Sequence, residues 1–184
     1  MRVLVLGTSG VEKRQYIRRI TDIPDSESNV YDLDQRIKHE EHGGSRSGYA
    51  TLLDNPNTEQ QREISNKYLR QILDKVGSHS SKPPHQFLLI HSVYFRNQNY
   101  FSLVDHDLLR EYQPDIIITL IDDFYDVARR INKKERKLTT SSEVSFEDVL
   151  GWRNTEIMMG DLLSKQLLKY PIEHYVIAVK HNPK

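Results

Sequence analysis

The sequence predicts a doubly wound, three-layer α/β/α fold whose five-stranded sheet is mostly parallel. Several short segments are apolar throughout rather than in alternation, which is typical of strands buried on both faces of a sheet. Longer segments between them carry apolar residues at helical spacing, and a glycine-containing loop follows the first apolar segment. Because ligands bind such sheets at the carboxyl ends of the strands, this loop marks the expected site.

The expected elements follow one another as one folded unit. The expected strands are residues 2–6, 87–91, 115–120 and 174–179, with a weaker fifth at residues 30–33. The expected helices are residues 12–20, 58–76, 103–112, 126–132 and 146–169. This order predicts one domain over residues 1–184.

Composition restricts the function classes. Lys and Arg together number 26, as do Asp and Glu, so the formal net charge is zero and does not indicate binding to nucleic acid or to an anionic membrane. The absence of cysteine excludes thiol catalysis, disulfides and cysteine-bound zinc. No segment approaches the roughly 20 apolar residues of a membrane span, so we expect a soluble, cytoplasmic protein.

Residues 7–14 (GTSGVEKR) match part of the phosphate-binding P-loop pattern G-x-x-G-x-G-K-[ST]. Gly7, Gly10 and Lys13 occupy expected positions. Glu12 replaces the last glycine, and Arg14 replaces the Ser or Thr that would hold Mg²⁺. The full set of expected nucleotide-binding residues in the loop is Gly7, Thr8, Ser9, Gly10, Val11, Glu12, Lys13 and Arg14. The alternative is a glycine turn that joins a strand to a helix and binds nothing.

The loop retains part of its chemistry. Gly7 and Gly10 allow positive φ, so that successive N–H groups converge on an anion, and the following helix adds its N-terminal partial charge. Lys13 supplies a full positive charge. The Glu12 carboxylate repels phosphate unless it turns outward or pairs with Arg14, which has only donors and therefore cannot bind Mg²⁺. The loop thus predicts a site for ATP, another nucleotide or phosphate.

The strand at residues 87–91 lacks the second metal anchor. In P-loop proteins, an acid near the end of a neighbouring apolar strand holds Mg²⁺. The segment HQFLLIHS has Leu88, Leu89 and Ile90 in that place, followed by His91 and Ser92. We therefore expect no protein ligand for a metal ion. We also expect that ordinary metal-assisted phosphoryl transfer has been abandoned or rebuilt.

Two polar segments interrupt the pattern. Residues 39–49 (HEEHGGSRSGY) predict a metal cluster, a mobile substrate loop or a solvated loop, and solvation is the commoner behaviour of such segments. Residues 133–144 (KKERKLTTSSEV) predict a lid that carries phosphate-binding charges, or an exposed helix end and loop.

Five segments together resemble one known family. They are MRVLVLGTSGVEK, FLLIHSVYF, REYQPDIIITLIDDFYDVARRI, the WRN of the last expected helix, and HYVIAVKHNP. In order and spacing they resemble the archaeal-type adenylate kinases and their eukaryotic nuclear relatives, which are P-loop nucleoside monophosphate kinases. The resemblance covers nearly the whole chain, although residues 35–85 match weakly. His91 matches a histidine of the family, whereas Leu89 stands where the family has an acid.

The resemblance implies a P-loop kinase-like domain with an acceptor-side insertion at about residues 35–80 and a lid at about residues 129–146. It implies that Lys13 and its loop bind donor phosphates and that Asn182 lies in the loop that contacts the donor base. It also implies that the transferred phosphoryl group is contacted by Arg129, Arg130 and Arg153. Arginines 129 and 130 equally suit a helix C-terminus without a ligand.

Three hypotheses remain open. The first is a degenerate adenylate kinase-like protein that binds nucleotide or phosphate, transfers phosphate poorly or not at all, and acts through a protein partner. The second is an active nucleoside monophosphate kinase in which Arg14 and Glu12 take over charge stabilisation. The third is a structural or interaction protein on a kinase fold. Loss of both metal anchors argues against the second, and retention of Lys13 and two glycines argues against the third.

Overall fold

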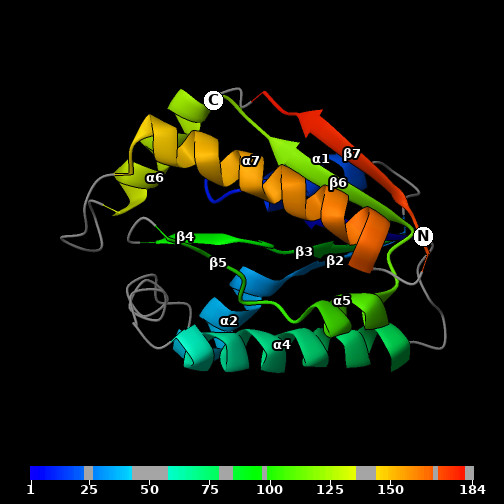
Figure 1. Cartoon of the computed structure of the whole chain (residues 1–184). Helices are drawn as coiled ribbons and strands as arrows, with labels where there is room; N and C mark the ends of the chain where they lie inside the picture. The colour runs from blue at the N-terminus through cyan, green and yellow to red at the C-terminus, as the bar shows by residue number, and fades with distance from the viewer. Residues whose placement is uncertain are drawn as a thin grey trace.

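The central sheet has five parallel strands. The computed structural model describes residues 1–22, 27–42, 58–78, 85–96, 99–135, 144–167 and 170–180. The strands lie in the order β2-β3-β1-β6-β7, and every neighbouring pair is parallel (Figure 1). Their bounds are β1 Arg2–Leu6, β2 Ser28–Asp32, β3 His85–Leu89, β6 Ile116–Ile121 and β7 Glu173–Ala178. The predicted fold class is confirmed.

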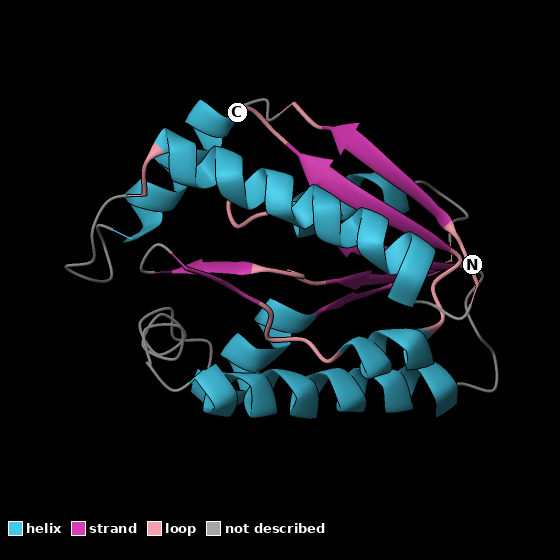
Figure 2. Ribbon diagram, in the orientation of Figure 1, coloured by secondary structure: helices cyan, strands magenta, loops and turns pink. Residues whose placement is uncertain are grey.

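Helices cover both faces of the sheet (Figure 2). They are α1 Lys13–Thr21, α2 Leu33–His42, α4 Thr58–Ser78, α5 His106–Tyr112, α6 Phe124–Glu135 and α7 Phe146–Leu162, which continues as the π-helical turn η1 Leu163–Leu167. In β1, Leu4 and Leu6 pack with α2, α4 and α5, whereas Val3 and Val5 pack with α1, α6 and the start of α7. Because side chains alternate along a strand, a strand buried on both faces is apolar throughout.

Helix α2 was not predicted from the sequence. Leu33 was expected to end a strand and His39 to begin a polar loop, but both lie in α2. Asp32 starts the helix by accepting a hydrogen bond from the Gln35 backbone N–H at 3.0 Å, and Leu33 and Ile37 bury one face of it. The loop interpretation is therefore wrong for residues 39–42, and residues 43–49 lie outside the described part of the chain.

Strand β7 departs from the expectation that it is buried on both faces. It lies at the edge of the sheet, and Tyr175, Val176 and Ile177 are 46%, 44% and 38% exposed. An edge strand has a neighbour on one side only, so its helices need not cover it. The apolar sequence indicated the strand correctly but not its exposure.

A short hairpin that the sequence analysis did not predict follows β3. Strands β4 Tyr94–Arg96 and β5 Asn99–Phe101 pair in antiparallel fashion. The hairpin packs against α7, where a Cβ added to Gly151 would lie 2.3 Å from the Tyr100 hydroxyl oxygen. No helix in the described ranges is long and apolar enough to cross a membrane.

Candidate functional site

Strand β1 leads directly into the predicted phosphate loop, whose backbone is left-handed at three positions. Gly7 has φ 145°, Gly10 has φ 84° and Glu12 has φ 60°. A Cβ at Gly7 would lie 2.6 Å from the Leu120 carbonyl oxygen, so glycine is required there. Glu12 also adopts a left-handed backbone, at a cost of about 1 kcal/mol in conformational energy.

Arg130 fastens this loop to the neighbouring elements. Its Nε donates to the Gly10 carbonyl at 2.8 Å, and its Nη2 pairs with Asp122, the residue that follows β6. The side chains of Arg130 and Asp122 are only 16% and 5% exposed. The arrangement ties α6, β6 and the loop together, so the guanidinium is occupied by the chain itself.

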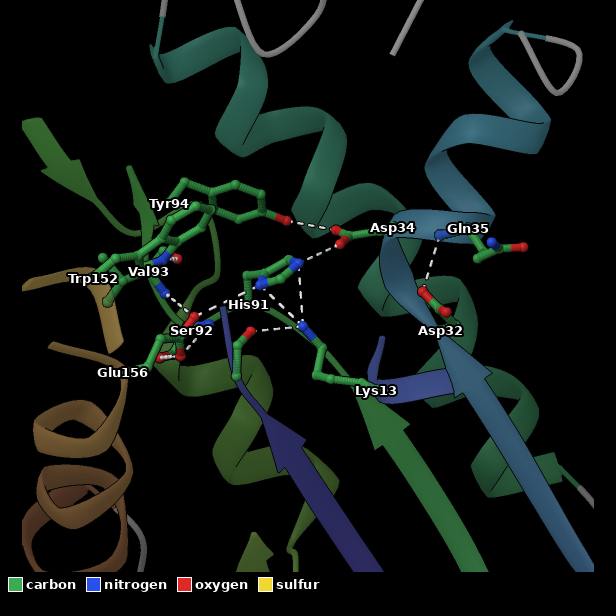
Figure 3. A network of polar contacts seen from close by, with 11 residues as sticks. Lys13, Asp32, Asp34, Gln35, His91, Ser92, Val93, Tyr94, Trp152 and Glu156 are labelled. Carbon is green, nitrogen blue, oxygen red and sulfur yellow. Dashed lines mark hydrogen bonds and ion pairs between the residues drawn. The ribbon is translucent and has the colours of Figure 1, made fainter. Parts of the chain in front are cut away.

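Lys13 lies in the first turn of α1, and its ammonium group reaches back to the base of the loop. Its Nζ donates to the Gly7 carbonyl at 2.7 Å and lies 3.0 and 3.1 Å from the two ring nitrogens of His91 (Figure 3). The ammonium is thus almost equally far from both nitrogens, and a change of imidazole tautomer leaves it in contact. Burial lowers the pKa of Lys13, although Asp34 and Glu156 oppose this effect.

His91 links Lys13 to a carboxylate of α2. Its Nε2 lies 2.8 Å from Oδ2 of Asp34, whose Oδ1 accepts a hydrogen bond from the Tyr94 hydroxyl at 2.6 Å. Burial disfavours the Asp34 carboxylate, but His91 and Lys13 outweigh burial and hold its pKa well below the usual range. Burial and Lys13 lower the pKa of His91, yet Asp34 and Glu156 prevail and raise it overall. The cluster therefore contains two bases and two acids.

Glu156 is the second acid, and sequence reasoning missed it. It lies on α7 with 0% exposure and accepts hydrogen bonds from the Ser92 N–H (3.3 Å), the Val93 N–H (3.4 Å) and the Ser92 hydroxyl. Its Oε1 is 3.7 Å from Nδ1 of His91. A signal was present, because Trp152, Glu156 and Gly160 recur every four residues on the buried face of α7.

The acids near Lys13 do not come from β3. Leu89 is buried in the core beneath the loop, at 1% exposure. The two carboxylates in the Lys13 cluster come instead from the start of α2 and from the middle of α7. In the described parts of the chain, no group of three or more His, Asp or Glu side chains is arranged to hold a metal ion.

A cavity of about 590 Å³, here called the loop cavity, opens at the carboxyl ends of the strands. Its walls come from the loop, α1, the end of β2 and the start of α2, with His91 below. The predicted loop residues that line it are Thr8, Ser9, Gly10, Glu12, Lys13 and Arg14. Gly7 and Val11 are buried beside it and are not part of its lining.

The other predicted residues are not brought together at this cavity. Arg129 is 77% exposed and pairs with Asp126 at 3.2 Å. The Arg153 guanidinium lies 5.9 Å from the centre of the Phe124 ring. Neither of these arginines nor Arg130 lines the loop cavity. Asn182 lies outside the described residues.

Comparisons with known proteins reveal a shared fold. No family model matches the sequence, and no curated protein matches it. The crystal structure of a shikimate kinase from Bacteroides thetaiotaomicron superposes with a TM-score of 0.53 at 10% sequence identity, covering 97% of this chain and 86% of that one. The chain has the P-loop kinase fold.

A gluconokinase from Sinorhizobium meliloti 1021 superposes with a TM-score of 0.49 at 15% identity, covering 99% of this chain and 83% of that one. At such identities a likeness concerns the fold alone. The resemblance to adenylate kinases therefore stays a prediction.

Proposed function

We propose that the chain is a degenerate, adenylate kinase-like protein that binds a nucleotide or phosphate in the loop cavity. In this proposal it transfers phosphate weakly or not at all, and acts through a protein partner. The observation that carries the proposal is the position of Lys13, at the wall of a cavity but within a cluster that already holds two carboxylates. The proposal retains the kinase-like domain over residues 1–184, with an acceptor-side insertion at about 35–80 and a lid at about 129–146.

Anion binding is supported by the backbone as well as by charge. Gly7 and Gly10 hold the loop in a left-handed conformation, and α1 starts at Lys13 with its N-terminus toward the loop. The helix dipole and unpaired N–H groups at such a start favour a phosphate. The carboxylates near Lys13 reduce the affinity for phosphate, because an entering phosphate competes with them for the ammonium.

Poor phosphoryl transfer is supported by the residues that replace the metal anchors. The fold family uses Mg²⁺, but the Arg14 guanidinium has only donors and the Leu89 side chain is a buried alkyl group. These residues do not fit the ion, so no step is assigned to it. Phosphoryl transfer depends mainly on positioning and electrostatic stabilisation, and loss of both anchors removes part of each.

One observation favours an active nucleoside monophosphate kinase as a second candidate. Asp32 and Asp34 line the loop cavity together with Lys13 and Arg14. Burial and Asp34 raise the pKa of Asp32, which makes this carboxylate a better proton acceptor for a hydroxyl or phosphate group. Arg14 supplies positive charge where the metal-binding hydroxyl is missing.

Calorimetric titration with ATP, ADP, AMP and inorganic phosphate, with and without Mg²⁺, tests the proposal. We expect binding that does not require Mg²⁺ and that weakens in Lys13→Ala, together with ADP production far below the ordinary kinase rate of about 1 to 100 per second. Turnover at that rate supports the second candidate instead. If nothing binds at millimolar concentration and Lys13→Ala changes nothing, both fail and a purely structural role on this fold remains.

Restoration of the missing groups provides the converse test. The triple variant Glu12→Gly, Arg14→Thr and Leu89→Asp returns the last glycine and both metal anchors. Kinase activity that appears in the triple variant, but in none of the single ones, supports a disabled phosphoryl-transfer site. A folded triple variant without activity contradicts the interpretation of the loop as a disabled phosphoryl-transfer site.

A further inference from the structure

A second cavity, of about 330 Å³, adjoins the loop cavity over the edge strand β2. We call it the edge cavity. Its walls come from β2, α1, α2 and α4, and it shares Arg14, Asp32 and Gln35 with the loop cavity. A ligand in one cavity therefore lies next to a ligand in the other, with these three side chains between them.

The two cavities differ in charge. The charged residues that line the loop cavity are Lys13, Arg14, Arg18, Arg19 and Lys38 against Glu12, Asp22, Asp32 and Asp34. Those of the edge cavity are Arg14, Arg36 and Lys75, with His39, against Asp32. The chain as a whole has a formal net charge of zero, so the edge cavity is a local concentration of positive charge.

One carboxylate, that of Asp32, lines the edge cavity against the three cations Arg14, Arg36 and Lys75. Asp32 Oδ1 is engaged with the Gln35 backbone N–H at 3.0 Å, and burial together with Asp34 raises the pKa of Asp32. Arg36 pairs with Glu40 at 3.1 Å, but these side chains are 34% and 38% exposed, and a half-exposed pair of this kind is weak. An anion can therefore compete for the Arg36 guanidinium.

Arg14 connects the two cavities. Within the described part of the chain, its guanidinium donates to the neutral side-chain oxygen of Gln35. Exchange of a neutral acceptor for an anionic one strengthens such a hydrogen bond. Arg14 can thus turn to an anion in either cavity without breaking an ion pair with a described carboxylate.

The remaining walls indicate the kind of molecule that carries the anion. Tyr31 and Ile72 belong to the same core cluster and form an apolar side of the edge cavity, next to the cations, whereas Val30 lines the cavity but packs against the other face of the sheet. We propose that the edge cavity binds a small organic anion, with its phosphate or carboxylate group on Arg36, Lys75 and Arg14 and its flat or apolar body against Tyr31 and Ile72. The identification of this anion as the phosphate acceptor rests on the proposed function. The existence of the anion site does not rest on it.

Nuclear magnetic resonance titration of the full chain tests the two cavities separately. The Gly10 amide reports on the loop cavity, and the methyl groups of Val30 and Ile72 report on the edge cavity. The probes are AMP, benzoate and neutral adenosine, with inorganic phosphate and ATP for the loop. We expect AMP or benzoate to shift the Val30 and Ile72 signals while adenosine does not, and the anion that binds more tightly identifies the preferred group.

Double variants then test which cationic side chains bind the anion. Arg36→Gln with Lys75→Gln should weaken anion binding at the Val30 and Ile72 signals at least about tenfold, while inorganic phosphate still shifts Gly10. The matched control is Arg62→Gln with Arg70→Gln, which removes two exposed charges from α4 outside both cavities. The proposed anion site in the edge cavity is overturned if both double variants weaken anion binding equally, or if the anions shift the Gly10 signal alone. If phosphate and ATP leave Gly10 unshifted, the proposed function fails instead, whatever happens at Val30 and Ile72.

Discussion

Two buried charge clusters flank the same loop and differ in what they face. The Arg130 cluster contains one base, one acid and the Gly10 carbonyl, and neither Arg130 nor Asp122 lines the loop cavity. The Lys13 cluster contains two bases and two acids and forms part of the cavity wall. A buried charge beside a phosphate loop can thus hold the loop in shape or remain available to a ligand. Variants of the two clusters should affect different properties.

The largest effect is expected from Glu156→Gln. The change leaves the carboxylate's three donors with a weaker acceptor and removes a charge that balances Lys13 and His91, so the free energy of unfolding should fall by about 3 kcal/mol. Urea denaturation measures the loss. Glu63→Gln on the exposed face of α4 is the control, and a loss no larger than in this control would contradict the buried role of Glu156.

Arg130→Ala should lower the free energy of unfolding by about 2 kcal/mol, because Asp122 stays buried without its partner. Arg130→Lys should recover only part of this, since Lys cannot donate to both Gly10 and Asp122 with a planar fork. Arg129→Ala, beside it but exposed, is the control. Equal stability of the two alanine variants would show that Arg130 does not fasten the loop.

Lys13→Ala should lower ligand affinity more than stability, which is the reverse of the effect expected from Arg130→Ala. We expect phosphate affinity to fall at least about tenfold, while stability changes less than in Arg130→Ala, because burial already disfavours the Lys13 ammonium. Calorimetry and urea denaturation on the same preparations give the two numbers. A variant that loses stability but keeps its phosphate affinity would remove the distinction between the clusters.

The pH dependence of stability should reveal the His91–Asp34 pair. The pKa of His91 is raised in the folded chain, so its contribution is full below the unfolded value of about 6.5 and is lost as pH rises through the folded pKa. The pKa of Asp34 is held low, so its contribution is present above about 3.9 and is lost as pH falls. The stability difference between wild type and His91→Gln should thus be greater at pH 5.5 than at pH 9. A difference between wild type and His91→Gln that does not change with pH would argue against the pair.

The smallest expected effect is in the loop backbone. Glu12→Gly removes the left-handed strain but makes the unfolded chain more flexible, so a net stabilisation of about 0.5 kcal/mol is expected. Thermal denaturation measures it. A destabilised variant would show that the contacts of the Glu12 side chain outweigh its backbone strain.

The sequence predicted the fold better than the site, for a physical reason. Burial on both faces makes β1, β3 and β6 mostly apolar, so local composition marks each strand. The same composition could not show that β7 lies at an edge, because its position depends on which strands pair. Helix α2 was obscured by its polar outer face, although Asp32 followed by Gln35 three residues later is a helix-start signal.

The candidate site was predicted where it is local in sequence. Residues 7–14 are contiguous, and six of them line the loop cavity. The partners of Lys13 come from α2, the end of β3 and α7, which are far apart along the chain, and only the folded topology brings them together. Arg130 was predicted to contact the transferred phosphoryl group, but the sequence could not show that it binds Gly10 and Asp122.

The contact between the hairpin and α7 leads to an expectation about evolution. A Cβ at position 151 would lie 2.3 Å from the Tyr100 hydroxyl oxygen, so the exposed Tyr100 side chain would have to turn aside. Among homologous chains, a residue other than glycine at 151 should therefore be accompanied by a smaller side chain at 100 or by a tyrosine that turns away from the helix. Lineages that shortened or lost this hairpin should be free to carry any helix-forming residue at 151.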